Sequence, residues 1–157
     1  MPEKKTTQRA RSDRRQGKSA STQAGEFVRE EIEHVREGEH GARSAKQAIA
    51  IGLSKARRAG VKLAAPAKGK TSGRTRRQAE RDLERGAAKR SGGAKKKTSA
   101  SRSRGAKKAL AKEGRSATSH ASLARQGRSA ARKRSAAERS ASAKKAARTR
   151  KKASRRK

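Results

Sequence analysis

The scarcity of large apolar side chains is the feature of this sequence that most limits how it can fold. Only 12 of its 157 residues are Leu, Ile, Val or Phe, while 48 Lys and Arg against 13 Asp and Glu leave a net charge of +35. Such a composition buries too little surface to offset the entropy lost on ordering. We therefore expect a mostly α-helical protein with extensive disorder, in which a short helical hairpin precedes a low-complexity basic tail with transient helices.

The large apolar residues are concentrated in one segment. Nine of the 12 lie between Phe27 and Leu63, so residues 22–63 are predicted to form a helical hairpin domain. Residues 1–21 are predicted to be a basic flexible arm, and residues 64–157 a disordered tail rich in Lys, Arg, Ala and Ser. Alanine favours helix, so the tail could form helices near residues 73–85, 106–113, 117–126 and 136–150.

The hairpin is expected to consist of helices at about 22–37 and 45–59. Apolar residues recur with the helical period on the first of these. The second begins with a capping box, in which Ser44 is followed three residues later by Gln47, and it ends before Gly60. A hairpin of this size has little core of its own. We therefore expect it to form a homodimer through residues 22–63, or to become ordered on a partner.

The positive surplus predicts a polyanionic partner. Residues 41–157 carry 39 basic and five acidic residues, and each phosphate that a protein neutralises releases condensed counterions. Phe27 is the only aromatic residue, so stacking on bases is not expected, and no zinc-finger or basic-zipper pattern is present to read base edges. We predict sequence-independent binding of nucleic acid, with DNA favoured over RNA, through the phosphate backbone.

The predicted contacts are spread over the second helix and the tail. They are Lys46, Lys55, Arg57, Arg58, Lys95, Lys96, Lys97, Arg102, Arg104, Lys107, Lys108, Arg115, Arg125, Arg128, Arg132, Lys133, Arg134, Lys144, Lys145, Arg148, Arg150, Lys151, Lys152, Arg155, Arg156 and Lys157.

Catalytic chemistry is not expected. Carboxylate catalysis needs a pocket that perturbs pKa values, and this chain has little core from which to build one. The segments around Lys18 and Lys70 lack the first glycine of a phosphate-binding loop, so no cofactor and no small-molecule substrate is predicted. His34 lies one turn after Glu30, but zinc sites use more ligands than that pair supplies. The chain is therefore expected to be neither an enzyme nor a metalloprotein.

Acidic residues also cluster, with six of the 13 lying in residues 26–40. A solvated helix face is the simplest interpretation of this cluster. A sharper hypothesis is that the acidic helix pairs with the basic tail, or with Lys46, Lys55, Arg57 and Arg58, and so competes with nucleic acid.

Two resemblances add to these expectations. Residues 26–38 and 41–63, with the sequence Lys-Gln-Ala-Ile-Ala-Ile at 46–51, resemble a family of small basic proteobacterial proteins whose domain is uncharacterised. The tail, with its Ala-Lys-Lys-Ala pattern at 106–109 and 143–146, is similar to linker-histone tails and bacterial histone-like proteins. The second resemblance implies coating or compaction of DNA in a bacterial nucleoid.

The same charges are compatible with other functions. The protein could instead associate with RNA or the ribosome, or residues 22–63 could be a protein-interaction module that carries a polyanion-binding tail. No apolar run is long enough to span a bilayer and no lipidation motif is present, so no membrane partner is expected. The expected location is cytoplasmic and nucleoid-associated.

Overall fold

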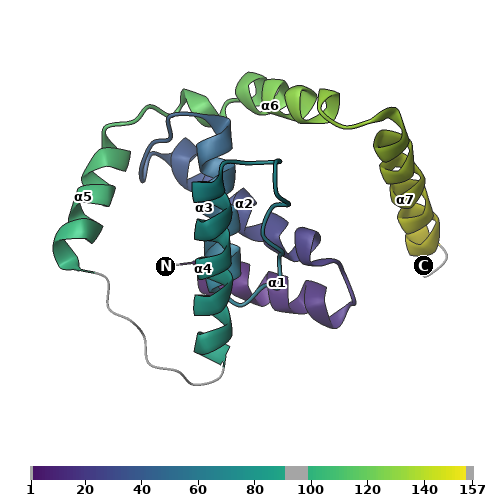
Figure 1. Ribbon diagram of the computed structural model, residues 1–157, viewed down its shortest axis with the longest axis horizontal. Helices are drawn as coiled ribbons and strands as arrows, with labels where there is room; N and C mark the ends of the chain where they lie inside the picture. The colour runs from purple at the N-terminus through teal and green to yellow at the C-terminus, as the bar shows by residue number, and fades with distance from the viewer. Residues whose placement is uncertain (1, 91–98, 155–157) are drawn as a thin grey trace. The chain divides into compact units, whose positions relative to one another are not determined.

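Helices make up most of this protein. The computed structural model describes residues 2–90 and 99–154, and within them no residue is in a strand. The chain divides into two compact units, Met1–Ser119 and His120–Lys157. In order along the described chain (Figure 1), the elements are α1 (Lys4–Arg15), α2 (Ala20–Glu37), α3 (Ala45–Arg58), α4 (Gly73–Arg90), α5 (Ala100–Ala111), the 3-10 helix η1 (Ser116–Thr118), α6 (His120–Arg132) and α7 (Ala136–Ser154).

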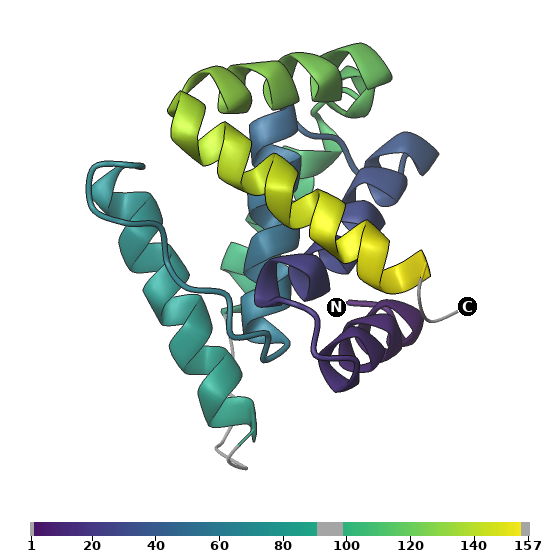
Figure 2. The same cartoon turned by 90° about the vertical axis from the view of Figure 1, so that its right-hand side faces the viewer.

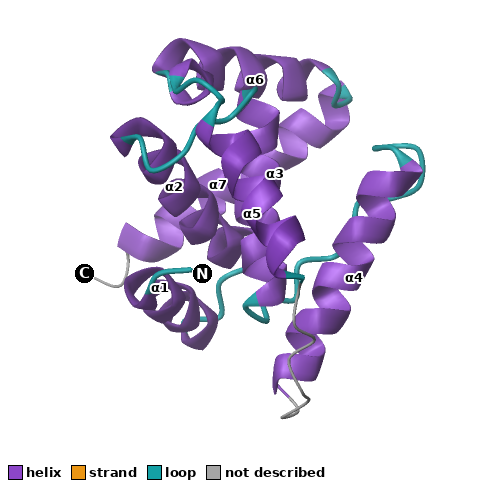
Figure 3. Ribbon diagram, turned by 90° about the vertical axis from the view of Figure 1, so that its left-hand side faces the viewer, coloured by secondary structure: helices purple, strands orange, loops and turns teal. Residues whose placement is uncertain are grey.

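In the first unit, α2 and α3 form the central pair of helices. α1 packs against α2, and α4 packs against α3, as Figures 2 and 3 show from two sides. One core cluster lies where α1, α2 and α3 meet and is built around Phe27, Ala24 and Ala56. A second lies near the turn between α2 and α3, where Val35 and Ala48 pack with Ala117.

Small residues make most of this core. Eight of the 11 buried hydrophobic residues among those described are alanines, and the other three are Phe27, Val35 and Val61. Glycines let the helix backbones approach closely. A Cβ atom on Gly52 of α3 would lie 2.7 Å from the Cα atom of Val28 in α2, and one on Gly86 of α4 would overlap the carbonyl oxygen of Arg57. Close backbone approach thus replaces large side chains as the source of packing contacts.

Local signals set the ends of the central helices. The Ser19 side chain caps α2, which begins two residues before the predicted start at residue 22, and Gly38 ends the helix in the left-handed conformation with φ 87°. The Ser44 hydroxyl accepts a hydrogen bond from the Gln47 backbone N–H at 3.3 Å, so the predicted start of α3 is correct. Gly60 follows α3 with φ 94°, and the Val61 N–H donates to the Ala56 carbonyl at 3.1 Å. These bonds satisfy backbone groups that helix ends otherwise leave unpaired.

A distant segment returns to the turn between α2 and α3. The Gly41 N–H donates to the Leu110 carbonyl at 3.0 Å, and the Ala42 N–H donates to the Gly114 carbonyl at 3.1 Å. The Arg36 side chain donates to the Thr118 carbonyl at 3.1 Å, and Thr118 itself is fully buried. The ordered first unit therefore extends well beyond residue 63.

The prediction of extensive disorder is wrong, because most of the residues that the structure describes lie in helices. Residues expected in a flexible arm form α1, whose buried face consists of Thr6, Ala10 and Asp13 at helical spacing. Residues expected in a disordered tail form α4 to α7. The prediction failed because it counted large apolar residues alone, whereas this chain packs through alanine, glycine and buried polar groups.

The helices of the second unit, residues 120–157, are stabilised differently from those of the first. None of its described residues is buried, so α6 and α7 depend on helix propensity and on their ends rather than on a core. At the start of α7 the Ser135 N–H donates to the Glu138 carboxylate at 2.8 Å, and the Glu138 N–H donates to the Ser135 hydroxyl at 3.1 Å. This reciprocal capping box stabilises the first turn of a strongly basic helix.

Gly52 provides a test of the close packing between α2 and α3. Replacing Gly52 by Ala should lower the free energy of unfolding by about 1–3 kcal/mol, because the new methyl group meets helix backbone that cannot rotate away. Gly25 in α2 is the matched control, since a Cβ atom there has no neighbour within 4 Å. Gly25→Ala should raise the free energy of unfolding by about 0.5–1 kcal/mol. Urea unfolding followed by circular dichroism measures both; shifts of the same sign would contradict the packing described.

Candidate nucleic-acid interface

The surplus of positive charge lies on exposed helix faces in both units. Residues 120–157 contain 15 basic residues and one acidic residue, and residues 1–119 contain 33 basic and 12 acidic residues. The net charges are therefore +14 and +21. Only those cations that are exposed, and not used inside the fold, can form a binding surface.

In the first unit, α4 presents a row of four arginines, Arg74, Arg77, Arg81 and Arg85, which we call the α4 stripe. The spacing i, i+3, i+7 and i+11 places them on one face of a helix, and all four are exposed. A row of this length covers about 16 Å at 1.5 Å per residue. Duplex DNA carries about ten phosphate charges over that length of axis.

The opposite face of α4 holds the helix on α3. Asp82 is 1% exposed and accepts hydrogen bonds from the Ser54 hydroxyl and, at 3.2 Å, from the Gln78 amide. The Arg58 guanidinium lies 3.7 Å from the same carboxylate. With Asp82 anchored inside, the four arginines remain exposed along α4, and Arg81 donates a hydrogen bond to the Gln78 side-chain oxygen at 2.9 Å.

In the second unit, α6 carries Arg125, Arg128 and Arg132 on one face, which we call the α6 stripe. All three are exposed, and together with Ser129 and Lys133 they line a shallow recess. Guanidinium groups bind phosphate with two parallel hydrogen bonds and stay charged at any physiological pH. The recess therefore has the chemistry of a phosphate-binding surface.

α7 continues the pattern with Lys144, Arg148 and Lys151 at i, i+4 and i+7, which we call the α7 stripe. The three residues are exposed. Like charges at this spacing destabilise an isolated helix, so binding to an anion should stabilise α7. The three stripes together supply ten exposed cations.

The structure sorts the predicted contact residues into three groups. Those that are exposed are Lys46, Arg58, Arg104, Lys107, Lys108, Arg115, Arg125, Arg128, Arg132, Lys133, Arg134, Lys144, Lys145, Arg148, Arg150 and Lys151. Lys95, Lys96, Lys97, Arg155, Arg156 and Lys157 lie outside the described residues, as do the side chains of Arg102 and Lys152. The remaining two, Lys55 and Arg57, face inward.

Arg57 is 7% exposed and is used inside the fold. Its guanidinium donates to the carbonyl oxygens of Leu63 at 3.1 Å and Ala64 at 3.3 Å, which fixes the segment after α3. Burial lowers the pKa of Arg57 from its ordinary value, and the Asp82 carboxylate acts in the opposite direction. A phosphate backbone would have to displace these contacts to reach it.

Lys55 forms ion pairs with two buried carboxylates of α2. Its ammonium lies 3.3 Å from Glu30 Oε1 and 2.6 Å from Glu31 Oε2, and Glu30 and Glu31 are 3% and 0% exposed. The acidic helix therefore does pair with Lys55, but within the core. Glu30 and Glu31 hold α2 to α3, and they do not form a solvated face from which a nucleic acid could displace them.

The α4 stripe was not among the predicted contact residues. Its signal is present in the sequence, because Arg74, Arg77, Arg81 and Arg85 share one helix face while Ala79, Asp82 and Gly86 share another. Only Leu83 is a large apolar residue in this segment, so the segment was expected to belong to a disordered tail. If alanine and glycine are counted as residues of a packed face, the same helix shows a second face made of the four arginines.

The residues best suited to hold a metal ion lie at the turn after α2. Glu31, His34 and His40 bring one ligand atom each to within 4.8 Å of one another. The sequence pointed to His34 beside Glu30, whereas the structure places His34 and His40 around Glu31. The left-handed turn at Gly38 carries His40 back over α2, and a pattern of spacings does not predict that return.

One family model matches the chain. It is described as a family of unknown function (DUF6496) and it covers residues 11–69, which include α2 and α3. This match confirms the expectation of an uncharacterised family for that part of the chain, and it brings no activity with it. No curated protein and no solved structure matches the chain.

Within the described residues, none of the helices combines the length and the apolar character that a bilayer span requires.

Proposed function

We propose that this protein binds duplex DNA through the phosphate backbone without reading base sequence, as a histone-like protein that coats or compacts a bacterial nucleoid. The observation that carries the proposal is the arrangement of ten exposed cations in the α4, α6 and α7 stripes. Each stripe is a row of charges along a helix, and a duplex offers a matching row of phosphates. Release of condensed counterions supplies the driving force.

The scarcity of aromatic residues supports contact with the phosphate backbone of the nucleic acid rather than with its bases. Proteins that bind single strands stack bases on exposed aromatic rings. Here the only aromatic residue is Phe27, and it is fully buried in the core of the first unit. Exposed arginine and lysine remain as the groups that could contact nucleic acid, and their charge binds any sequence.

The distribution of charge over two units supports coating or compaction. Both units carry basic stripes, and the second has a single acidic residue, Glu138, among its 38 positions. Two basic units in one chain can bind two stretches of backbone, and the second binding step then benefits from a raised effective concentration. The resemblance of the tail to linker histones favours DNA over RNA as the partner.

A homodimer was predicted because a hairpin of residues 22–63 has little core of its own. In the structure, α1 and α4 pack on that hairpin, and residues 110–118 join it at the turn after α2. These contacts enlarge the core of the hairpin, and a homodimer through residues 22–63 stays a prediction.

Binding to duplexes of equal length and unrelated sequence tests the proposal. We expect dissociation constants that agree within about threefold, because phosphate contacts carry no sequence information. Fluorescence anisotropy at fixed salt measures them, with an RNA duplex of the same length as a third arm. A preference of a hundredfold or more for one DNA sequence would contradict backbone binding. A comparable preference for RNA would contradict the choice of DNA.

A further inference from the structure

The second half of α2 holds a buried carboxylate whose oxygens accept no regular hydrogen bond. Glu31 is 0% exposed, and neither Oε1 nor Oε2 has a hydrogen-bond donor of acceptable geometry. The ammonium of Lys55 is 2.6 Å from Oε2 as an ion pair. Oε1 faces His40 instead, at 3.4 Å from Nε2. A buried carboxylate oxygen without a donor is costly, so it indicates that a cation belongs beside it.

The His40 ring is oriented as metal-binding histidines are. Its Nδ1 atom lies 3.2 Å from the Gly41 carbonyl oxygen, a contact that assigns the proton of a neutral ring to Nδ1. Nε2 then carries a lone pair that points toward Glu31 Oε1. Because Oε1 also carries only lone pairs, neither atom supplies a proton for a hydrogen bond between them. Metal-bound histidines commonly donate their other N–H to a backbone carbonyl in this way, which fixes the ring for its ligand.

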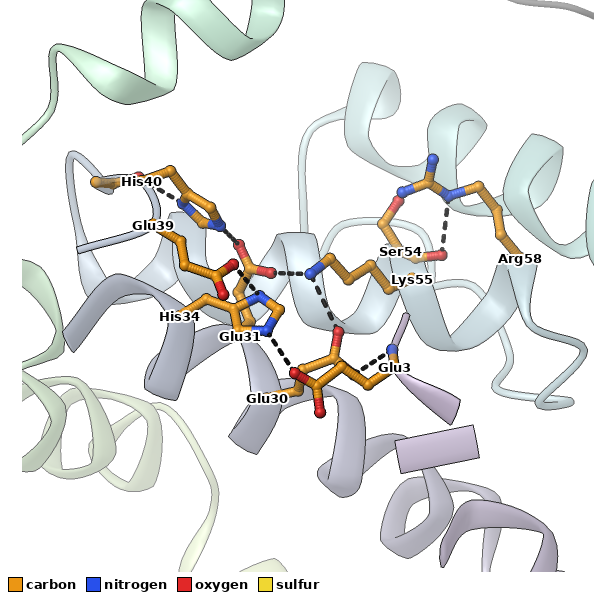
Figure 4. Close-up of polar contacts among 10 residues, drawn as sticks. Glu3, Glu30, Glu31, His34, Glu39, His40, Ser54, Lys55 and Arg58 are labelled. Carbon is orange, nitrogen blue, oxygen red and sulfur yellow. Dashed lines mark hydrogen bonds and ion pairs between the residues drawn. The ribbon is translucent and has the colours of Figure 1, made fainter. Parts of the chain in front are cut away.

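His34 adds a second imidazole, and the surrounding charge favours a cation. Its Nδ1 atom lies 3.4 Å from Glu39 Oε2, and its Nε2 atom lies 3.3 Å from Glu3 Oε1 (Figure 4). Glu30 and Glu31 pair with the one ammonium of the cluster, that of Lys55, whereas Glu3 and Glu39 pair with His34. With neutral imidazoles the cluster carries four negative charges and one positive charge, in a chain whose net charge is +35.

The geometry is close to that of a bound ion. The three ligand atoms lie within 4.8 Å of one another, and donors around tetrahedral zinc are about 3.4 Å apart when each bond is about 2.1 Å. Glu31 and His34 lie on adjacent turns of α2, which fixes their spacing. His40 lies on the turn between Gly38 and Gly41, and its side chain would have to rotate to close the remaining gap.

From this geometry we propose that Glu31, His34 and His40 bind a zinc ion. Two imidazoles and a carboxylate select zinc over calcium or magnesium, which prefer oxygen ligands. Oε1 of Glu31 would be the carboxylate ligand, since Lys55 already neutralises Oε2, and Glu39 or a water molecule would complete four-coordination. Bound zinc would attach the turn at residues 38–41 to α2. This inference does not depend on the proposed binding of DNA.

Calorimetric titration of the full-length, untagged and chelator-treated chain with zinc chloride at neutral pH tests the site. We expect one ion per chain and a rise in the unfolding temperature on binding, because a ligand that binds only the folded state stabilises it. His40→Gln should weaken zinc binding by about a hundredfold or more, since loss of a group that merely orients a ligand already costs 10–100-fold. His120→Gln is the matched control and should leave zinc affinity unchanged, because His120 is exposed on α6 in the other unit.

Cobalt supplies a second readout that does not depend on stability. Co²⁺ bound to the unsubstituted chain should show the visible absorption of four-coordination, and zinc should displace it. His40→Gln should abolish that spectrum while retaining the helical circular dichroism of the parent. The proposal is overturned if the chain takes up no zinc, if His40→Gln binds zinc as tightly as the parent, or if His120→Gln loses the ion as well.

Discussion

Lys55→Met should lower the free energy of unfolding by about 3–5 kcal/mol, the cost of removing one partner from a buried ion pair. Methionine keeps much of the apolar stem of lysine, so the change is mainly the loss of the ammonium. Glu30 and Glu31 then remain at 3% and 0% exposure without their positive partner. Urea unfolding followed by far-ultraviolet circular dichroism measures the loss.

Lys46→Met is the matched control for this substitution. Lys46 belongs to the same helix, α3, and is exposed. Surface substitutions of this kind usually change stability by no more than about 0.5 kcal/mol. Equal, small losses in the two variants would show that Glu30 and Glu31 do not depend on Lys55. That result would restore the interpretation of the acidic helix as a solvated face.

Replacing the four arginines of the α4 stripe by glutamine should weaken DNA binding by several orders of magnitude at low salt. Each phosphate contact contributes about 0.9 to the slope of log K against log[salt], which corresponds to roughly tenfold in affinity at 50 mM salt. Four lost contacts therefore reduce the steepness of the slope by about 3.6 and the affinity by roughly ten-thousandfold. Glutamine has nearly the helix propensity of arginine, so α4 should remain folded.

The matched control keeps the charge and removes the guanidinium groups. Lysine at the same four positions should retain the salt slope within about one unit, because counterion release depends on charge. If the lysine variant binds DNA more weakly than the parent while its salt slope is unchanged, the difference in affinity measures the bidentate contacts that only arginine makes. If the glutamine variant keeps the slope of the parent, the α4 stripe does not contact phosphate.

Helix positions were the part of this structure that the sequence predicted best. The Ser44 capping box and Gly60 set the ends of α3, and four helices follow the Ala-rich and charged segments of the predicted tail. These are local features, in which a residue's chemistry acts on backbone groups within one or two turns. The extent of ordered structure was not predicted, because a count of large apolar side chains ignores what alanine and glycine contribute through close backbone approach.

The roles of individual charged residues were predicted less well. Lys55 and Lys46 have the same chemistry, and only their positions on α3 distinguish them. Lys55 lies three residues after Gly52 and seven after Ala48, on the flank of the buried face. That register could have indicated a buried ion pair.

The cluster around Glu31 depends on contacts distant in sequence. His40 reaches it through the turn at Gly38, and Glu3 reaches it from the start of α1. The return of residues 110–118 to the same turn joins residues far apart in sequence, as in the pair formed by Arg43 and Glu113, which are 70 residues apart. Local patterns carry no information about such pairings, since they follow from how the whole chain packs.

The salt dependence of DNA binding by the unsubstituted chain tests the central claim most directly. If the ten cations of the α4, α6 and α7 stripes meet phosphates, log K should fall with log[salt] at a slope near −9, a loss of about 10⁵ in affinity between 50 and 200 mM salt. A slope near zero would contradict the account, because binding would then not depend on the release of counterions from a charged backbone.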